Sequence, residues 1–393
     1  MRAYFAPNGV GLGHVGRCVP IAKRLVHNNA EVLFSTYGEG LEYVEHENFP
    51  LIKAPPIGLK VKPDGTVDFR QTAVKPGPFL ASFTLMRQVN TEIRAMESYK
   101  PDIVISDSRA TPLLAASILN IPTICILNQF QIIIPRTRHL LRLARFADAI
   151  NLTIVGKIWT LGRTVLIPDF PAPNTISVGN LTIPQYYRKK VKLIGGILPK
   201  YSSELPSQKG LRKKLGLSPA RTVIFAPISG PVGEKKFFIK ILKKIFMKLP
   251  DDYEIIFSLG SPNTDPEPIS CGNTRIFNWI PNRFEYLKAS DLVIARAGHS
   301  TIMQSIFYGK PMILVPTPSH SEQLNNAMQA EKIGVANVIG QDRLNKESLL
   351  AKVKGMLNIT ALEKLEEIQL IVQEYNGLEK AVREIIEITG NNN

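Results

Sequence analysis

The chain alternates short apolar segments with helix-like segments, and it does so twice. The apolar segments are RAYFAP, EVLFST, FPLIKA, DIVISD and TICIL in the first half, and RTVIFAP, YEIIFSLG, TRIFNWI, DLVIA and PMILVP in the second. This alternation is typical of a parallel sheet wrapped by helices, because each parallel crossover needs a helix-sized connection. A chain of 393 residues also exceeds what one core usually supports. The sequence therefore predicts an α/β protein of two Rossmann-like domains, residues 1–185 and 186–393, with a cleft between them.

Cysteine content and apolar runs exclude several classes of protein. Cys18, Cys125 and Cys271 stand alone without a CxxC spacing, which argues against a disulfide scaffold and a thiolate zinc site. The opening MRAYFAPNGVGLGH is typical of a strand running into a glycine loop and not of a signal peptide. Residues 112–135 carry no formal charge, but polar side chains and Pro122 interrupt them. We therefore predict a helix, a turn and a buried strand there instead of a transmembrane span.

The net charge of +15 is concentrated in one window: residues 131–214 hold 15 Lys/Arg against 3 Asp/Glu. Such a zone favours a polyanion, either nucleic acid or anionic lipid headgroups. Its arginines are spaced like one face of a helix among Ile and Leu, with almost no base-stacking aromatics, which favours a membrane surface over nucleic acid. The candidate membrane-contact residues are Arg136, Arg138, Arg142 and Arg145. The alternative is a solvated amphipathic helix docked on its own domain.

A glycine loop, PNGVGLGHVGR, follows the first apolar segment. Gly11, Gly13 and Gly16 spell GxGxxG, which also occurs in dinucleotide sites. Such a site would need an acidic residue at the end of the next strand, where this chain has Ser-Thr-Tyr. NAD binding is therefore disfavoured. The loop can instead bring backbone N–H groups and a helix amino end close to another ligand.

Two side chains near this loop form a candidate catalytic pair. His14 lies at a helix start, where the positive dipole end favours a neutral, basic imidazole. Asp107 ends the strand DIVISD, so parallel strands would place it at the same sheet edge. His14 could then act as a general base that Asp107 orients. The alternatives are a histidine that only caps its helix and an Asp107–Arg109 structural pair.

The second half holds the more specific pattern, RAGHSTIMQ…GKP…P…SEQLNNA. Its glycine loop again opens a helix, and Arg296, Ser300 and Thr301 add a guanidinium and hydroxyls to free N–H groups. This is chemistry for a diphosphate. Gln304, one turn into the helix, could reach a ribose, and Glu322 with its neighbour could bind sugar hydroxyls.

These motifs resemble those of the two-domain (GT-B fold) inverting glycosyltransferases, and within them the MurG-like branch that makes lipid-linked sugars. GLGH, ISG followed by PVG, and RAGHSTxxxQ…GKP…P…EQxxNA carry the resemblance, which covers most of the chain. Gln304 departs from the family, which usually has glutamate at the ribose-diol position. An amide can still donate and accept hydrogen bonds there.

The resemblance implies a role for each matching residue. His14 would deprotonate the acceptor hydroxyl with Asp107 as its support, and the acceptor side would include Gly11, Gly13 and Asn128. The donor would be bound by Ser229, Gly230, Arg296, Gly298, His299, Ser300, Thr301, Gln304, Glu322 and Gln323. No DxD pair occurs in a suitable loop, so we expect no cofactor and no metal, with the helix dipole and Arg296 acting in place of a metal.

The chain is most similar to archaeal single-chain proteins related to the eukaryotic two-subunit enzyme that adds the second GlcNAc to dolichol-linked GlcNAc. This resemblance implies UDP-GlcNAc as donor, a polyprenyl- or dolichyl-diphosphate-linked GlcNAc as acceptor, and a peripheral position on the cytoplasmic face of the cell membrane. A homodimer is expected from relatives alone, and no nucleic-acid partner is expected. Alternatives are a diacylglycerol glycosyltransferase, a UDP-GlcNAc 2-epimerase, and a non-enzymatic basic scaffold.

Overall fold

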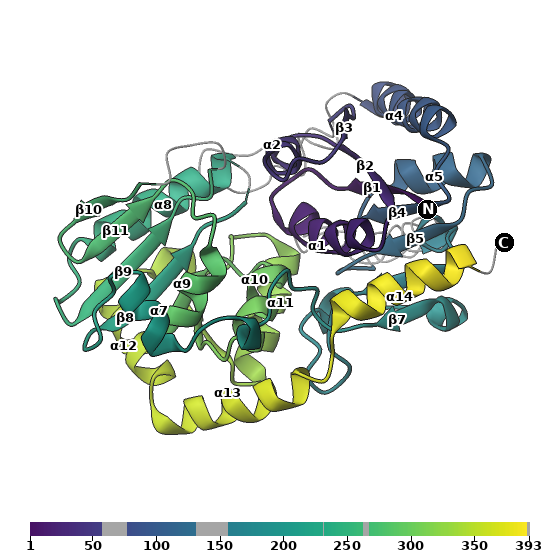
Figure 1. Ribbon diagram of the computed structural model, residues 1–393. Helices are drawn as coiled ribbons and strands as arrows, with labels where there is room; N and C mark the ends of the chain where they lie inside the picture. Colours follow the sequence, from purple (N-terminus) through teal and green to yellow (C-terminus); the bar gives the residue numbers. More distant parts are fainter. Residues whose placement is uncertain (57–76, 131–155, 231, 262–266, 391–393) are drawn as a thin grey trace, which may run out of the picture.

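The computed structural model describes residues 1–56, 77–130, 156–230, 232–261 and 267–390. They form two lobes, each built on a seven-stranded sheet covered by helices (Figure 1). The predicted fold class, two Rossmann-like α/β domains, is confirmed.

The first sheet has the strand order β3-β2-β1-β4-β5-β6-β7, and all its pairs are parallel. Its strands are β1 (Arg2–Pro7), β2 (Glu31–Thr36), β3 (Leu51–Lys53), β4 (Ile103–Asp107), β5 (Thr123–Ile126), β6 (Thr164–Ile167) and β7 (Val191–Leu193). Its helices are α1 (Gly13–His27), α2 (Glu39–His46), α4 (Gly77–Tyr99), α5 (Ala110–Ile118), and the 3₁₀ turns η1 (Val178–Asn180) and η2 (Gln185–Lys190). The strand order reverses between β1 and β4, so a crevice opens beyond their carboxyl ends.

The second sheet has the order β10-β11-β9-β8-β12-β13-β14, and only β10 pairs antiparallel. Its strands are β8 (Thr222–Pro227), β9 (Tyr253–Ser258), β10 (Ile269–Cys271), β11 (Thr274–Phe277), β12 (Leu292–Ala295), β13 (Met312–Leu314) and β14 (Ala336–Val338). The helical elements are η3 (Ser202–Glu204), α7 (Gln208–Lys214), α8 (Val232–Phe246), α9 (Arg283–Ala289), α10 (His299–Phe307), α11 (Ser321–Lys332), η4 (Gln341–Arg343), α12 (Lys346–Met356) and α13 (Ile359–Val372). Here the order reverses between β8 and β12, which sets a second crevice opposite the first.

Helices cover both faces of each sheet because the central strands are apolar on both sides. Every residue of β4, β5 and β12 is buried. In the first domain, α1 packs on one face through Cys18 and Leu25, whereas α4 and α5 pack on the other through Met96 and Ala115. This packing holds the strand ends, and therefore the loops that follow them, in fixed positions.

The first sheet extends beyond residue 185, where the predicted first domain ends. β7 pairs with β6, and α7 follows it before the second sheet begins. The chain also returns at its end: α14 (Gly377–Gly390), yellow in Figure 1, lies along the first domain. Its apolar side chains Leu378, Val382 and Ile385 join the first-domain core. The amphipathic helix thus covers a sheet face that is remote in sequence.

The membrane-related predictions have two outcomes. Where the chain is described, no helix is long and apolar enough to cross a bilayer. The uncharged stretch up to residue 130 contains α5 and β5, the predicted helix and strand. The four candidate membrane-contact residues, Arg136, Arg138, Arg142 and Arg145, lie in 131–155, outside the described residues, so their role stays a prediction.

Candidate active site in the interdomain cleft

A cleft of about 430 Å³ lies between the two domains, a volume within the range of small-molecule sites. The loops that follow β1 and β5 line it from the first domain, and those that follow β8, β12 and β13 line it from the second. The predicted site residues that border it are Gly11, Gly13, His14, Asn128, Ser229, Gly230, Arg296, Gly298, His299, Ser300, Thr301, Gln304, Glu322 and Gln323. Asp107 is fully buried behind His14.

The glycine loops of the two domains face each other closely. A Cβ on Gly11 would lie 3.9 Å from the Cα of Gly230, and a Cβ on Gly13 would lie 3.3 Å from Ser300 Oγ. Gly11 has φ +71°, which glycine adopts without steric cost. The start of α1 and the start of α10 therefore lie on opposite walls of one cleft.

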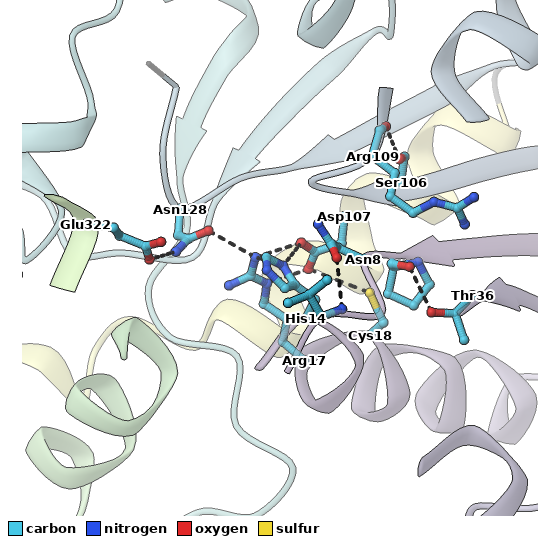
Figure 2. A network of polar contacts seen from close by, with 12 residues as sticks. Asn8, His14, Arg17, Cys18, Thr36, Ser106, Asp107, Arg109, Asn128 and Glu322 are labelled. Atoms are coloured by element: carbon cyan, nitrogen blue, oxygen red, sulfur yellow. Dashed lines mark hydrogen bonds and ion pairs between the residues drawn. The ribbon is translucent and has the colours of Figure 1, made fainter. Parts of the chain in front are cut away.

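His14 and Asp107 form a hydrogen-bonded pair, seen at the centre of Figure 2, with 2.7 Å between Nδ1 and Oδ1. The side chain of His14 is 23% exposed, whereas that of Asp107 has no exposure. A proton on Nδ1 is required to donate to the carboxylate, so this contact leaves the lone pair of Nε2 free. The geometry suits an imidazole that accepts a proton on Nε2 while Asp107 balances its charge.

Arg17, which sequence reasoning missed, completes this pair. It lies three residues after His14, on the same face of α1, and binds Asp107 through Nε and through Nη2, the latter at 2.7 Å from Oδ1. Burial alone would raise the pKa of Asp107. The charges of Arg17 and then of His14 lower it by a larger amount, so the net pKa is about 2. Asp107 is therefore a carboxylate at neutral pH. The HxxR spacing in the glycine loop was the available signal.

Arg109, the rival partner for Asp107, points elsewhere. Its Nη2 lies 2.5 Å from Glu92 Oε1, and its Nη1 donates to the Ser35 carbonyl at 2.8 Å. The backbone between the two residues turns at Ser108, which has φ +56°. Asp107 and Arg109, which would share a face of a continuing strand, are thereby separated.

The amino end of α10 opens onto the second-domain side of the cleft. Gly298 precedes the helix, and a Cβ on it would meet nothing within 4 Å, so the space beside it is open. The first N–H groups of a helix lack intrahelical partners and lie at the positive end of its dipole. With the hydroxyls of Ser300 and Thr301 alongside, this wall is suited to an anion such as a diphosphate.

The guanidinium of Arg296 is engaged inside the second domain. Nη1 donates to the Val315 carbonyl at 3.0 Å, Nη2 donates to Gln341 Oε1 at 2.6 Å, and the group lies 3.9 Å from the centre of the Phe238 ring. Burial lowers the pKa of Arg296 to about 10, with partial compensation by Glu234. Both Nη atoms are therefore occupied within the second domain, although Arg296 also lines the cleft, and its expected phosphate contact stays a prediction.

His299 contacts a residue of the opposite domain. Its Nε2 lies 3.1 Å from Oδ2 of Asp169, a first-domain residue, and both side chains are buried. Burial alone would raise the pKa of Asp169. Its contacts with His299 and then with Ser177 lower it by a larger amount, so the net pKa is below the usual value. The imidazole thus joins the two domains, and the expected donor-binding role of His299 stays a prediction.

The expected sugar-binding pair splits in two directions. Gln323 is held within its own domain, since its Oε1 accepts from the Thr317 amide at 2.9 Å and its Nε2 donates to Glu234 at 3.3 Å. Glu322 reaches across the cleft and accepts a short hydrogen bond from the side chain of Asn128. Of the two, Glu322 has the position from which a ligand in the cleft can be bound.

An aromatic wall at the cleft was also missed at the sequence level. Trp279 and Phe284, which follow β11, line it together with Arg283. Trp279 also contacts the first domain, with its ring centre 6.1 Å from that of Tyr43 and edge-on to it. The segment NWIPNRFEYL carried the signal, because flat apolar rings after a strand suit a nucleobase.

Two family models match the chain. Residues 1–189 match glycosyl transferase family 1, and residues 232–380 match the glycosyltransferase family 28 C-terminal domain. An uncharacterised glycosyltransferase of Methanosarcina acetivorans is 26% identical over 395 residues, which cover 96% of each chain. A protein of Caldanaerobacter subterraneus, named UDP-N-acetylglucosamine–N-acetylmuramyl-(pentapeptide) pyrophosphoryl-undecaprenol N-acetylglucosamine transferase, is 25% identical over 92% of each chain.

Solved structures agree on the architecture. MurG of Acinetobacter baumannii superposes with a TM-score of 0.57 at 17% identity, covering 98% of this chain and 99% of the other. At that identity the likeness shows the fold alone, whereas the family models and the sequence relatives add the activity class. The chain is therefore a glycosyltransferase with the two-domain GT-B fold, and its residues 232–380 match the model of the C-terminal domain of glycosyltransferase family 28.

Proposed function

We propose that this enzyme transfers GlcNAc from UDP-GlcNAc to a polyprenyl- or dolichyl-diphosphate-linked GlcNAc, giving a β-linked disaccharide for protein N-glycosylation. One observation carries the proposal: the His14–Asp107 pair and the amino end of α10 face each other across one cleft. The name of the Caldanaerobacter relative contains UDP-N-acetylglucosamine and pyrophosphoryl-undecaprenol, which supports the proposed donor and the proposed class of acceptor.

The proposed reaction is a single in-line displacement. Nε2 of His14 takes the proton of the acceptor hydroxyl while that oxygen attacks the anomeric carbon of the donor. The bond between this carbon and the β-phosphate oxygen breaks, UDP leaves, and an α-linked donor gives a β-linked product. The proton ends on His14, where the ionised Asp107 stabilises the imidazolium.

The leaving diphosphate would be stabilised by the second domain. The free N–H groups of α10, with Ser300 and Thr301, offer donors where negative charge develops. Trp279 and Phe284 would receive the uracil, and Gln304 the ribose. On this proposal turnover needs no metal, so activity measured with and without EDTA should be equal.

A described surface of the first domain supports a peripheral place on the cytoplasmic face of the membrane. Leu161 and Tyr186 are exposed, and Lys190 ties their two segments together through the Thr160 and Gly162 carbonyls at 2.9 and 3.1 Å. The exposed basic residues nearby in the sequence include Lys157, Arg163, Arg188 and Lys189. The described stretch from residue 156 to residue 192 contains a single acidic residue, Asp169, and its side chain is buried against His299. Exposed apolar and basic groups together suit anionic headgroups.

The test is mass spectrometry of products from a panel of UDP-sugars offered with a synthetic lipid-diphosphate-GlcNAc acceptor. A lipid-linked disaccharide formed from UDP-GlcNAc supports the proposal. Transfer to diacylglycerol instead would move the enzyme to glycolipid synthesis, and an altered monosaccharide after incubation with UDP-GlcNAc alone would indicate an epimerase. Sedimentation with anionic vesicles but not with neutral ones tests the membrane surface.

A further inference from the structure

A continuous chain of polar contacts runs from the catalytic pair across the cleft, as Figure 2 shows. His14 contacts Asp107, Asp107 binds Arg17, Arg17 donates to Asn128, and Asn128 donates to Glu322 of the second domain. The first four belong to α1, to the end of β4 and to the loop after β5. Glu322 belongs to α11, so the last contact joins the domains.

The orientation of the Asn128 amide is fixed by its two partners. Arg17 Nη2 lies 3.3 Å from the amide oxygen, and a guanidinium can only donate hydrogen bonds. The oxygen must therefore face Arg17, which leaves the NH₂ group to face Glu322, and a carboxylate can only accept. Asn128 is 6% exposed, so it has little freedom to turn over. An aspartate or a leucine of similar size could not make both contacts.

This contact determines the position of the Glu322 carboxylate. Oε1 is held by Asn128, and among the described residues of the first domain no other side chain holds Oε2. Glu322 lines the cleft near the first turn of α11, and its long side chain would otherwise sample several rotamers. Holding one oxygen from the opposite domain leaves the other free to accept hydrogen bonds from a sugar in the cleft.

We propose that Asn128 is a positioning residue for the donor sugar: it holds Glu322 from the opposite domain, so that the sugar of the donor, but not its nucleotide, is recognised only when the domains meet. This inference rests on the proposed function, because it assigns Asn128 and Glu322 to the subsite for the donor sugar. The nucleotide wall at α10 and Trp279 includes neither Asn128 nor Glu322. Removal of the Asn128 side chain should therefore weaken the binding of UDP-GlcNAc and leave the binding of UDP nearly unchanged.

The experiment compares UDP with UDP-GlcNAc by calorimetry in wild type and Asn128→Ala. We expect the variant to bind UDP-GlcNAc about tenfold more weakly, since a hydrogen bond to a charged group is lost, and to bind UDP within about twofold of wild type. In turnover, the donor KM should rise by a similar factor while kcat falls less. Equal weakening of UDP and UDP-GlcNAc, or none of either, would overturn the inference.

Asn325→Ala is the matched control. Asn325 Nδ2 donates to Asn180 Oδ1 at 2.9 Å, so this pair is also an amide contact between the domains, but neither residue lines the cleft. The control should bind both ligands within about twofold of wild type. If it weakened UDP-GlcNAc as Asn128→Ala does, a general loosening of the interface would explain the effect and Asn128 would have no specific role.

A double-mutant cycle tests whether Asn128 acts through Glu322. Asn128→Asp alone places a second carboxylate opposite that of Glu322. Because the two charges repel, this variant should bind UDP-GlcNAc more weakly than Asn128→Ala does. Adding Glu322→Gln restores an amide–carboxylate hydrogen bond with its direction reversed, so the double variant should bind no worse than Glu322→Gln alone. Strictly additive losses would show that the two side chains are uncoupled.

The outcomes separate this inference from the proposed function. If wild type binds and turns over another UDP-sugar from the panel, that sugar replaces UDP-GlcNAc in the comparison, and only the donor assignment has failed. If wild type uses UDP-GlcNAc and Asn128→Ala binds it normally, only the inference has failed. If wild type binds no UDP-sugar, both have failed.

Discussion

The loop after β1 and the loop after β12 both open a helix onto the cleft, yet they offer different groups. The first presents one imidazole, backed by a buried carboxylate that is itself held by Arg17. The second presents glycine backbone, hydroxyls and helix N–H groups, while its nearby charged side chain, Arg296, is engaged inside the domain. The same topological position thus presents two different sets of chemical groups.

The difference follows from what each step of a transfer reaction requires. A proton acceptor must have one orientation and one protonation state, and a buried ion pair behind it fixes both. A leaving diphosphate needs several donors that are already in place, which backbone amides at a helix start supply without reorganisation. Substitutions on the two walls should therefore have different effects on turnover and on UDP binding.

The largest effect is expected on the first-domain wall. His14→Ala should lower kcat by roughly 10²- to 10⁴-fold, because the proton acceptor is removed, while UDP affinity stays nearly unchanged. Stopped-time product assays and calorimetry with UDP measure the two quantities. Equal losses of turnover and UDP binding would contradict the separation of the two walls.

Removing Arg17 should mainly affect stability. Arg17→Met leaves Asp107 buried without its strongest partner and should lower the free energy of unfolding by about 3 kcal/mol at pH 7. Arg24→Met on the same helix is the control, because its pair with Glu379 is largely exposed and should contribute less than about 1 kcal/mol. Urea denaturation measures both, and similar losses in the two variants would refute the role of the buried pair.

The same variant has a defined pH dependence. In wild type the pKa of Asp107 is depressed to about 2, so its stabilising contribution is present above its unfolded pKa of about 4 and is lost as pH falls toward 2. Without Arg17 this pKa rises, so Asp107 takes a proton at higher pH in the variant than in wild type. The stability deficit of Arg17→Met should therefore be largest at neutral pH and shrink as pH falls. A deficit that grows on acidification would reverse the sign of the proposed linkage.

On the second-domain wall, Ser300→Ala should weaken UDP binding by about tenfold, because a hydroxyl donor to a charged phosphate is lost. Once UDP-sugar is saturating, kcat should fall less than it does in His14→Ala. Calorimetry with UDP and with uridine distinguishes the phosphate contact, since uridine affinity should be unaffected. Equal weakening of both ligands would place the serine away from the phosphates.

The smallest expected effect on ligand affinity is that of Arg296→Met. Its guanidinium contacts Val315, Gln341 and Phe238, so the change should cost roughly 1–2 kcal/mol of stability but should alter UDP affinity by less than about threefold. Thermal unfolding and calorimetry give the two values. A large loss of UDP affinity at unchanged stability would show that Arg296 leaves its partners to bind the diphosphate.

Much of the fold could be predicted because the central strands are short apolar runs between helix-like segments. RAYFAP and EVLFST coincide with β1 and β2, and DLVIA contains β12. β7 was missed because VKL has no apolar run, and its pairing with β6 comes from the sheet edge it completes. The return of α14 to the first domain was also not predictable, since periodicity indicates an apolar face but not the surface that it covers.

The sequence by itself determined which groups stand at the strand ends: the glycine loops, His14, Asp107 and the hydroxyls of α10, because parallel strands bring their carboxyl ends to one edge. Only the tertiary structure decided which of them meet. Arg17 rather than Arg109 pairs with Asp107, the side chains of Arg296 and His299 find partners within the protein, and Asn128 reaches Glu322. A spacing of residues fixes where side chains begin, but their partners depend on backbone turns and on the packing of one domain against the other.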